Sequence, residues 1–303
     1  MTTQPDGYST NDTLGSLVDE VITSLQGYGL IVDQVCSLVG NITADQTQIT
    51  IDSGDMLSRG VIEIDHELMY VSRCQNGVAT VPAWGRGHKG TGKREHADGS
   101  AVYISPTYPR SIVSREVNNT IRSLYPQLFA VKTHSVEVTG YTWQVPVPAD
   151  ADRVVSVEWK YDSIGGWRPL NSWELSHSSD STDFPTGKCL SLGDSLPPVA
   201  QVHVRYAAAP TLLPTEASAF ADTGLPTSCR DVVVFGAASR LLPWSDAGRT
   251  PVDSVSSDAQ DQAKPIGAAI SVARELRTLY QTRLAQERMA LLARYPVPVH
   301  RIR

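Results

Sequence analysis

Residues of types that could bind a nucleotide lie in one short segment of this chain. The segment 87–94, Gly-His-Lys-Gly-Thr-Gly-Lys-Arg, nearly fits the phosphate-binding pattern G-x-x-x-x-G-K-[ST]. The last position is Arg94, which has no hydroxyl for magnesium, and the residues after it do not begin a helix whose N-terminus could hold a phosphate. The segment is therefore interpreted as a glycine-rich turn between two strands.

Acidic and histidine side chains surround this segment. Glu63, Asp65 and Glu67 alternate along a predicted hairpin and could share one face, and glycoside hydrolysis needs a carboxylate pair of this kind. Solvated carboxylates beside a turn at Asp65 explain the same spacing more simply. His88 and His96 lack the further ligands that a metal requires. We therefore predict no catalytic, cofactor or metal site, and no enzyme, with a glycan-cleaving pair kept as an alternative.

Tryptophans form another candidate site. Trp143, Trp159, Trp167 and Trp173 fall in one strand-rich region and could stack on sugar rings. Alternation along strands buries every second side chain, so the core of a small β domain is the favoured interpretation. A carbohydrate-binding protein remains the alternative.

Composition and charge restrict the function classes. The 303 residues are 41% apolar and 19% charged, with no long apolar run for a membrane span and no expected secretory signal. Four scattered cysteines without a CxxC pair indicate synthesis in a reducing cytoplasm. From Arg274 onward, seven arginines and two glutamates give a net charge of +5. Because the whole chain has a net charge of −6, residues 1–273 have a net charge of −11. A basic end on an acidic body suggests an anionic partner, or a solvated helix face.

Periodicity places these residues on an α+β architecture. Apolar spacing predicts helices over 12–26, capped by Asp12 or Thr13, over 109–129, over 229–242 and over about 265–295. Strands are predicted across 49–104 with a hairpin at Asn76–Gly77, and across 136–206 with turns at 162–166 and at Gly193–Asp194. The segment 245–262 is predicted to be a loop.

The elements group into a helical core with two inserted β-rich domains. The predicted divisions are an N-terminal helical segment 1–40, a small β module 41–107, a helix 108–131, a β-sandwich-like domain 132–212, C-terminal helices 213–295 and an extended tail 296–303.

The C-terminal helix has an apolar stripe between two basic edges. Arg277 and Arg288, eleven residues apart, flank one edge, and Arg283 and Arg294 flank the other. Arginine stems covering the core of their own domain explain this pattern. A partner groove with acidic rims explains it equally well. The tail beyond Tyr295 cannot build a core alone, and we expect it to order only against another surface.

Two sets of motifs resemble those of known proteins. The hairpin 62–71 and the tail pattern R-G-x-x-G-T-x-x-x-x-H-x-x-G-x-x-V are similar to a module of tailed-bacteriophage structural proteins. The matching residues are Arg86, Gly87, Gly90, Thr91, His96, Gly99 and Val102. The segments 146–150, 166–170, 204–210, 231–242 and 280–292 follow in an order that resembles the large head-to-tail connector (adaptor) proteins of phages infecting actinobacteria.

That resemblance implies a structural role in the virion. Such connectors form rings, usually of twelve copies, beneath the portal protein, with the next neck protein (a stopper or tail terminator) below and genomic DNA passing through without sequence-specific binding. The resemblance implies a location at the head–tail junction, no membrane contact and docking by the C-terminal helix and tail. The docking residues expected on this basis are Arg277, Arg283, Arg288, Arg294, Tyr295, Val297, Val299, His300, Arg301, Ile302 and Arg303. A tail or baseplate structural protein is the alternative within the same class.

Overall fold

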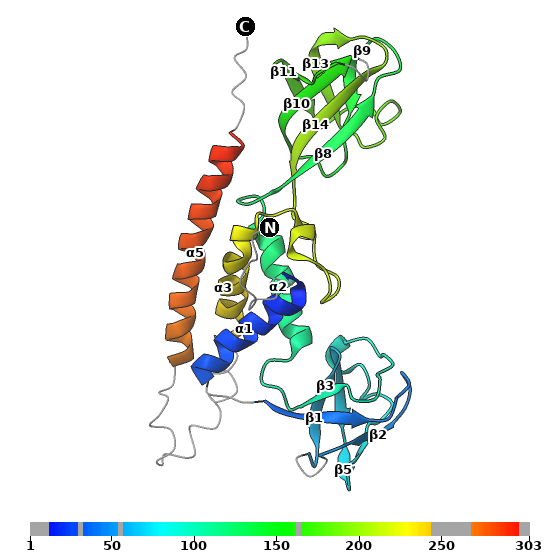
Figure 1. The fold of residues 1–303 in the computed structure, drawn as a ribbon, viewed down its shortest axis with the longest axis vertical. Helices are drawn as coiled ribbons and strands as arrows, with labels where there is room; N and C mark the ends of the chain where they lie inside the picture. The colour runs from blue at the N-terminus through cyan, green and yellow to red at the C-terminus, as the bar shows by residue number, and fades with distance from the viewer. Residues whose placement is uncertain (1–11, 30–32, 54–56, 162–164, 244–267, 297–303) are drawn as a thin grey trace, which may run out of the picture. The chain divides into compact units, whose positions relative to one another are not determined.

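The computed structural model describes residues 12–29, 33–53, 57–161, 165–243 and 268–296 (Figure 1). Over these residues the protein is a mixed α+β fold with four α-helices and three antiparallel sheets. The α+β class predicted from the sequence is confirmed. The chain divides into two compact units, one of residues 1–120 and 233–280 and the other of residues 121–232 and 281–303.

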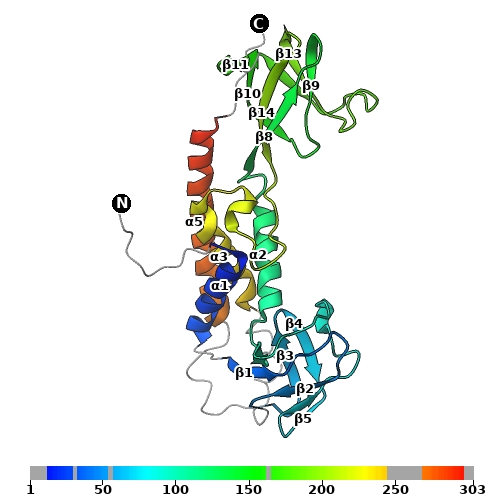
Figure 2. The same cartoon turned by 45° about the vertical axis from the view of Figure 1, so that its right-hand side comes forward.

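A seven-stranded antiparallel sheet forms the β module of the first unit, in the order β4-β3-β7-β1-β2-β6-β5. Strands β1 to β5 are labelled in Figure 2. Its strands are β1 (Gln34–Val39), β2 (Gln48–Ile51), β3 (Gly60–Ile64), β4 (Glu67–Val71), β5 (Arg73–Gln75), β6 (Val78–Thr80) and β7 (Ala101–Ile104). Two-residue turns join β3 to β4 and β5 to β6. Asp65 and His66 have φ of 44° and 70°, and Asn76 and Gly77 have 51° and 77°, which matches the twist of antiparallel strands.

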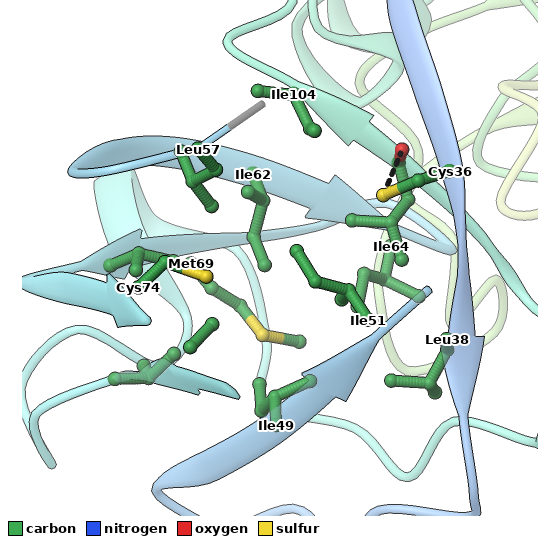
Figure 3. Packing of buried hydrophobic residues seen from close by; sticks show 14 of the residues in the cluster. Cys36, Leu38, Ile49, Ile51, Leu57, Ile62, Ile64, Met69, Cys74 and Ile104 are labelled. Carbon is green, nitrogen blue, oxygen red and sulfur yellow. Dashed lines mark hydrogen bonds between the residues drawn. The ribbon is translucent and has the colours of Figure 1, made fainter. Parts of the chain in front are cut away.

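One hydrophobic core fills this module, and all seven strands contribute to it (Figure 3). Because every strand turns side chains toward the same cluster, the sheet must curve around it. Ile49, Ile62, Ile64 and Met69 are fully buried there. The thiol of Cys36 lies 3.7 Å from the carbonyl oxygen of Val102. Four free cysteines occur over the chain, all buried.

The helical part of the first unit begins with α1 (Leu14–Gly29). Thr13 caps it, because its hydroxyl accepts the Ser16 N–H at 3.3 Å while Ser16 Oγ accepts the Thr13 N–H at 3.1 Å. The apolar spacing that predicted this helix is that of Leu14, Leu17, Val18, Val21, Ile22 and Leu25, and all of these are buried except the half-buried Ile22.

The other helices are α2 (Arg110–Leu124), α3 (Arg230–Leu241) and α5 (Ala268–Arg294). Helix α2 ends at Leu124, just before Pro126, so the predicted span of 109–129 is too long at its C-terminal end. A Cβ placed on Gly236 of α3 would lie 2.5 Å from Thr120 Cγ2 and 3.0 Å from Tyr280 Cε2. Only glycine allows α3 to approach α2 and α5 so closely.

Two facing sheets form a β-sandwich in the second unit. The four-stranded sheet has the order β11-β10-β14-β8 and the three-stranded sheet the order β12-β13-β9. Their shared core includes Val145, Val157, Leu190 and Val204. The strands are β8 (Ala130–Glu137), β9 (Thr142–Pro146), β10 (Arg153–Tyr161), β11 (Arg168–Leu170), β12 (Trp173–Ser176), β13 (Cys189–Leu196) and β14 (Ala200–Ala208).

Two local features differ from the sequence prediction. Strand β1 was not identified, because it lies in a segment interpreted as helical. The turn predicted at Gly193–Asp194 is wrong: both residues lie within β13, where the register against β9 shifts between Ser191 and Leu196. Glycine is needed there because a Cβ would lie 2.3 Å from Ser172 Oγ and 2.7 Å from Ser172 Cβ. The Gly193 N–H donates to Ser172 O at 2.9 Å.

Three predicted features lie wholly or partly outside the described residues. They are the turn at 162–166, the loop at 245–262 and the tail beyond Pro296. Within the described part of the chain, no helix combines the length and hydrophobicity needed to cross a membrane.

Candidate functional site: a buried ion network and the C-terminal helix

The carboxylate of Glu67 is the centre of a buried ion network in the β module. Glu67 and Arg86 form a two-pronged ion pair, with Arg86 Nε 2.8 Å from Oε1 and Nη2 3.0 Å from Oε2. His96 Nε2 lies 3.0 Å from Glu67 Oε2, and His96 Nδ1 lies 2.9 Å from Asp65 Oδ2. The side chains of Glu67, Arg86 and His96 are fully buried, whereas that of Asp65 is half exposed.

Backbone groups complete the network. The N–H groups of Gly87 and Arg94 donate to the Glu67 carboxylate at 2.9 Å and 2.8 Å. Arg86 donates in turn to the carbonyl oxygens of Thr43, Gln46 and Arg94. The loop that resembles a phosphate-binding sequence therefore cradles a carboxylate of its own chain.

The network fixes the charge of its members. Burial alone would raise the pKa of Glu67, but hydrogen bonds from His96, Arg86 and two backbone N–H groups outweigh it and lower that pKa to about 2. Burial alone would lower the pKa of His96, but hydrogen bonds to Glu67 and Asp65 raise it. Glu67 is ionised and enclosed, so it has no proton to donate as a general acid.

The remaining motif residues shape the loop around this centre. Gly87, Gly90 and Gly99 have φ of 63°, 82° and 80°, which L side chains rarely adopt. Thr91 Oγ1 accepts the Leu68 N–H at 3.0 Å and donates to His88 O at 2.9 Å. The motif thus specifies the conformation of the module.

The second buried carboxylate connects the module to a helix. Glu63 is 1% exposed and accepts the N–H groups of Arg110 at 2.8 Å and Ser111 at 2.9 Å. These amides begin α2, where a negative charge is favoured by the helix dipole. The interpretation of Glu63 and Glu67 as solvated turn carboxylates is therefore wrong.

The tryptophans do not form one platform. Trp159 and Trp173 pack against the sandwich core, as the favoured interpretation predicted. Trp143 is 58% exposed and precedes Val145 on β9 of the three-stranded sheet. Trp167, next to the four-stranded sheet, stacks on His203 with ring centroids 3.6 Å apart.

A polar cluster joins two further motif segments, 146–150 and 204–210. Asp150 accepts from Lys132 Nζ at 2.9 Å and from the Tyr206 hydroxyl at 3.2 Å. Burial and the neighbouring Asp150 raise the pKa of Tyr206 to about 12. Lys188 Nζ donates to the carbonyl oxygens of Ala149 and Ala151 at 2.7 Å and 2.8 Å.

The C-terminal helix α5 is 27 residues long, about 40 Å at 1.5 Å per residue. Ala269, Ala273, Leu284 and Leu291 of the predicted stripe are buried, so the chain itself covers this face. The stripe also contains the half-buried Leu276 and Tyr280.

One predicted docking residue has its partners inside the chain. Arg283 Nε lies 2.6 Å from Asp231 Oδ2 in the first turn of α3, and Nη2 lies 2.9 Å from Glu287 Oε1. Glu287 also accepts the Ser228 hydroxyl at 2.6 Å. Arg283 therefore ties α5 to the start of α3, and the hydrogen bond and charge of Asp231 raise its pKa further.

The other docking arginines lie on the surface. Arg277, Arg288 and Arg294 are exposed, and within the described ranges Arg277 and Arg288 take part in no ion pair. The Arg294 guanidinium lies 5.4 Å from the ring centroid of the half-buried Tyr295. The remaining candidates, Val297, Val299, His300, Arg301, Ile302 and Arg303, lie outside the described residues.

The sequence analysis did not predict the ion-pair partners of Glu67 and Asp231. The sequence pattern that could have drawn attention to Glu67 is its position two residues after Asp65 in the hairpin 62–71. Its partners Arg86 and His96, however, are 19 and 29 residues away. The signal for Asp231 was an acid in the first turn of a predicted helix.

Comparison with solved structures finds a structural likeness to a component of a particle neck. No family model and no curated protein matches the chain. A chain of a solved structure titled "Neck of empty GTA particle computed with C6 symmetry" is 15% identical, and the match covers 55% of this chain and 79% of that one. The TM-score is 0.23, so this likeness by itself assigns neither fold nor function.

Proposed function

We propose that this protein is a structural component of the neck of a tailed-phage particle, and specifically a head-to-tail connector. In this proposal several copies, twelve as in the resembling connectors, form a ring beneath the portal protein. The C-terminal helix and the tail attach the ring to the portal, and the next neck protein, a stopper or tail terminator, binds below. The assembled protein would lie at the head–tail junction after synthesis in the host cytoplasm.

The observation that carries this proposal is the division of roles along α5. Its apolar stripe and Arg283 are engaged within the chain, so the helix is held without a partner. Arg277, Arg288 and Arg294 remain at the surface of the same helix. A firmly held helix with outward guanidinium groups suits docking to carboxylates of a large partner, because arginine binds carboxylates in a fixed fork geometry.

Both β domains support a structural role. In the β module, Glu67 and His96 are engaged in the buried network, and Glu63 caps α2. The domains also expose large aromatic side chains, with Trp84 at 67%, Tyr141 at 79% and Trp143 at 58%. Exposed aromatic groups of this size are enriched where proteins contact each other.

The overall charge agrees with passage of DNA through the ring. Residues 1–273 carry −11, and non-specific affinity for DNA depends on clustered Lys and Arg near phosphates. A ring lined mainly by this acidic part would let DNA pass without holding it.

Portal binding tests the proposal directly. The full chain is mixed with purified portal rings, and the complexes are separated by gradient sedimentation and imaged by electron microscopy. Removal of residues 296–303 is expected to abolish attachment while the circular dichroism spectrum is preserved. Removal of residues 1–8 is a control of equal length. Portal binding that survives loss of the tail would contradict the docking assignment.

Localisation separates this proposal from its rivals. A gold label on the C-terminus of the protein is imaged on purified virus particles. Label at the head–tail junction supports a connector, and label at the tail tip favours a tail or baseplate protein. A particle without label would favour the carbohydrate-binding or glycan-cleaving alternative.

A further inference from the structure

A small pocket lies beside the second half of α5. It has a volume of about 220 Å³ and is lined by Pro126, Gln127, Phe129, Arg153, Arg288 and Leu292. The turn after α2, the first residue of β10 and two turns of α5 supply these side chains. All six belong to the second compact unit.

The guanidinium group of Arg153 forms one wall of the pocket. The Arg153 guanidinium lies over the Phe129 ring, 4.6 Å from its centroid. Its Nη2 atom is buried, yet it makes no hydrogen bond within the described residues. A buried donor without an acceptor is costly, and more so when it carries charge.

A second cation faces the same space. Arg288 also lines the pocket, and none of the six lining residues is acidic. The nearest carboxylate in sequence, Asp152, is already engaged by the Tyr125 hydroxyl and by Lys188 Nζ. Two guanidinium groups therefore line a cavity to which no acidic side chain of the described residues contributes.

We propose that this pocket receives a single carboxylate side chain, from an aspartate or glutamate of the portal protein. A carboxylate would accept from Arg153 Nη2 and from Arg288, and the Gln127 amide offers a further donor. The methylene groups of the acid would lie against Pro126, Phe129 and Leu292. The identity of the partner rests on the proposed function, whereas the carboxylate chemistry follows from the pocket.

A DNA phosphate fits this site less well. Phosphate contacts are made by cations that reach out to an exposed backbone, but Arg153 Nη2 is buried. Three of the six lining residues are apolar, which suits a side chain that enters a pocket.

The first experiment uses the full chain alone, with sodium acetate as the probe. Arginine guanidinium signals are followed by NMR during the titration, with sodium chloride at equal ionic strength as the blank. The Arg153 and Arg288 signals are expected to shift saturably, and each single variant, Arg153→Met or Arg288→Met, should abolish the shift at the other residue. Arg277→Met is the matched control on the same helix. Equal shifts in acetate and chloride would overturn the carboxylate pocket.

The second experiment measures portal affinity. Arg153→Met and Arg288→Met are expected to weaken binding by roughly thirtyfold or more, because each leaves a buried carboxylate poorly paired. Amide exchange in peptides from the sandwich of the free Arg153→Met protein should not accelerate, since the buried Nη2 atom has no acceptor within the described residues. Faster exchange there with unchanged portal affinity would show that Arg153 is structural and overturn the proposal.

The two experiments fail in distinguishable ways. If the intact chain does not bind portal at all, the connector proposal fails while the acetate titration still reports on the pocket. If the chain binds portal but both methionine variants bind equally well, the portal carboxylate is excluded. The titration is repeated with sodium phosphate, and a phosphate-dependent shift without an acetate-dependent one would replace the carboxylate by a phosphate ligand.

Discussion

Replacing Glu67 by glutamine tests whether one carboxylate organises the β module. The carboxylate accepts hydrogen bonds from Arg86 at two atoms, from His96 and from the N–H groups of Gly87 and Arg94. Glutamine keeps the shape but places an NH₂ group where only acceptors fit. It also leaves the fully buried Arg86 without its counter-ion.

The expected loss of stability follows from the burial of this pair. Removing one member of a buried, hydrogen-bonded ion pair costs about 3–5 kcal/mol, because the remaining charge is neither paired nor solvated. Each factor of ten in an equilibrium corresponds to about 1.4 kcal/mol. Local opening of the module should therefore become roughly a hundredfold to several thousandfold more populated in Glu67→Gln.

Hydrogen exchange measured by mass spectrometry is the appropriate assay, because the chain has two units and a single unfolding midpoint would mix them. Peptides from residues 60–104 should exchange faster by that factor, and peptides from the sandwich should not change. Glu63→Gln is the matched control, since this carboxylate is also buried but accepts only backbone N–H groups. Its cost should be about 1 kcal/mol, the typical value of a helix cap.

The reasoning is refuted if Glu67→Gln and Glu63→Gln accelerate exchange equally, or if Glu67→Gln changes it less than about tenfold. Either outcome would mean that backbone hydrogen bonds alone hold the loop and that the charge of Glu67 contributes little.

Three further predictions concern pH, α5 and the sandwich. The pKa of Glu67 is lowered from 4.5 to about 2, so the stability of the module should fall as pH drops from about 4.5 towards 2. The pKa of His96 is raised from 6.5, so the stability should also fall as pH rises above 6.5. In His96→Gln only the second loss should vanish when amide exchange is measured against pH. Asp231→Asn should speed amide exchange in residues 281–294, because it removes the Arg283 ion pair at 2.6 Å, and unchanged exchange would show that this pair is dispensable. Gly193→Ala should destabilise the sandwich by about 1–3 kcal/mol, since the new methyl group would lie 2.3 Å from a neighbouring side-chain oxygen, and faster amide exchange in peptides from the sandwich would report this loss.

Local patterns in the sequence predicted the helices well. Thr13 caps α1, the spacing of Leu17, Val18 and Val21 marks its buried face, and Asn76–Gly77 marks a tight hairpin. Each of these signals depends on residues within one or two turns of each other. Local chemistry decides such features, so a single sequence is enough to find them.

Long-range pairing could not be predicted in the same way. Glu63 looks like any acid in a strand, yet its partners at the start of α2 are 47 and 48 residues away. Strand β1 was missed because its partner strand β7 lies more than sixty residues later, as in the pairing of Gln34 with Ile104. The Arg283 edge of α5 has the same spacing as the Arg277 edge, and only the fold shows that Asp231 engages Arg283.

The chain contains two arginine arrangements built for a carboxylate, and their difference supports the inference about the pocket. Around Glu67 the guanidinium of Arg86 and two backbone N–H groups already hold an acid of the same chain, so that site is complete. Around Arg153 the geometry is similar in kind, with a buried donor and a second guanidinium from Arg288, but the lining residues supply no acid. Arg86 is fully buried and requires its counter-ion, whereas Arg153 is half buried, and a carboxylate at its buried Nη2 atom would supply the acceptor that the described residues do not. The first is provided by folding, and the second is left for a partner that binds beside α5.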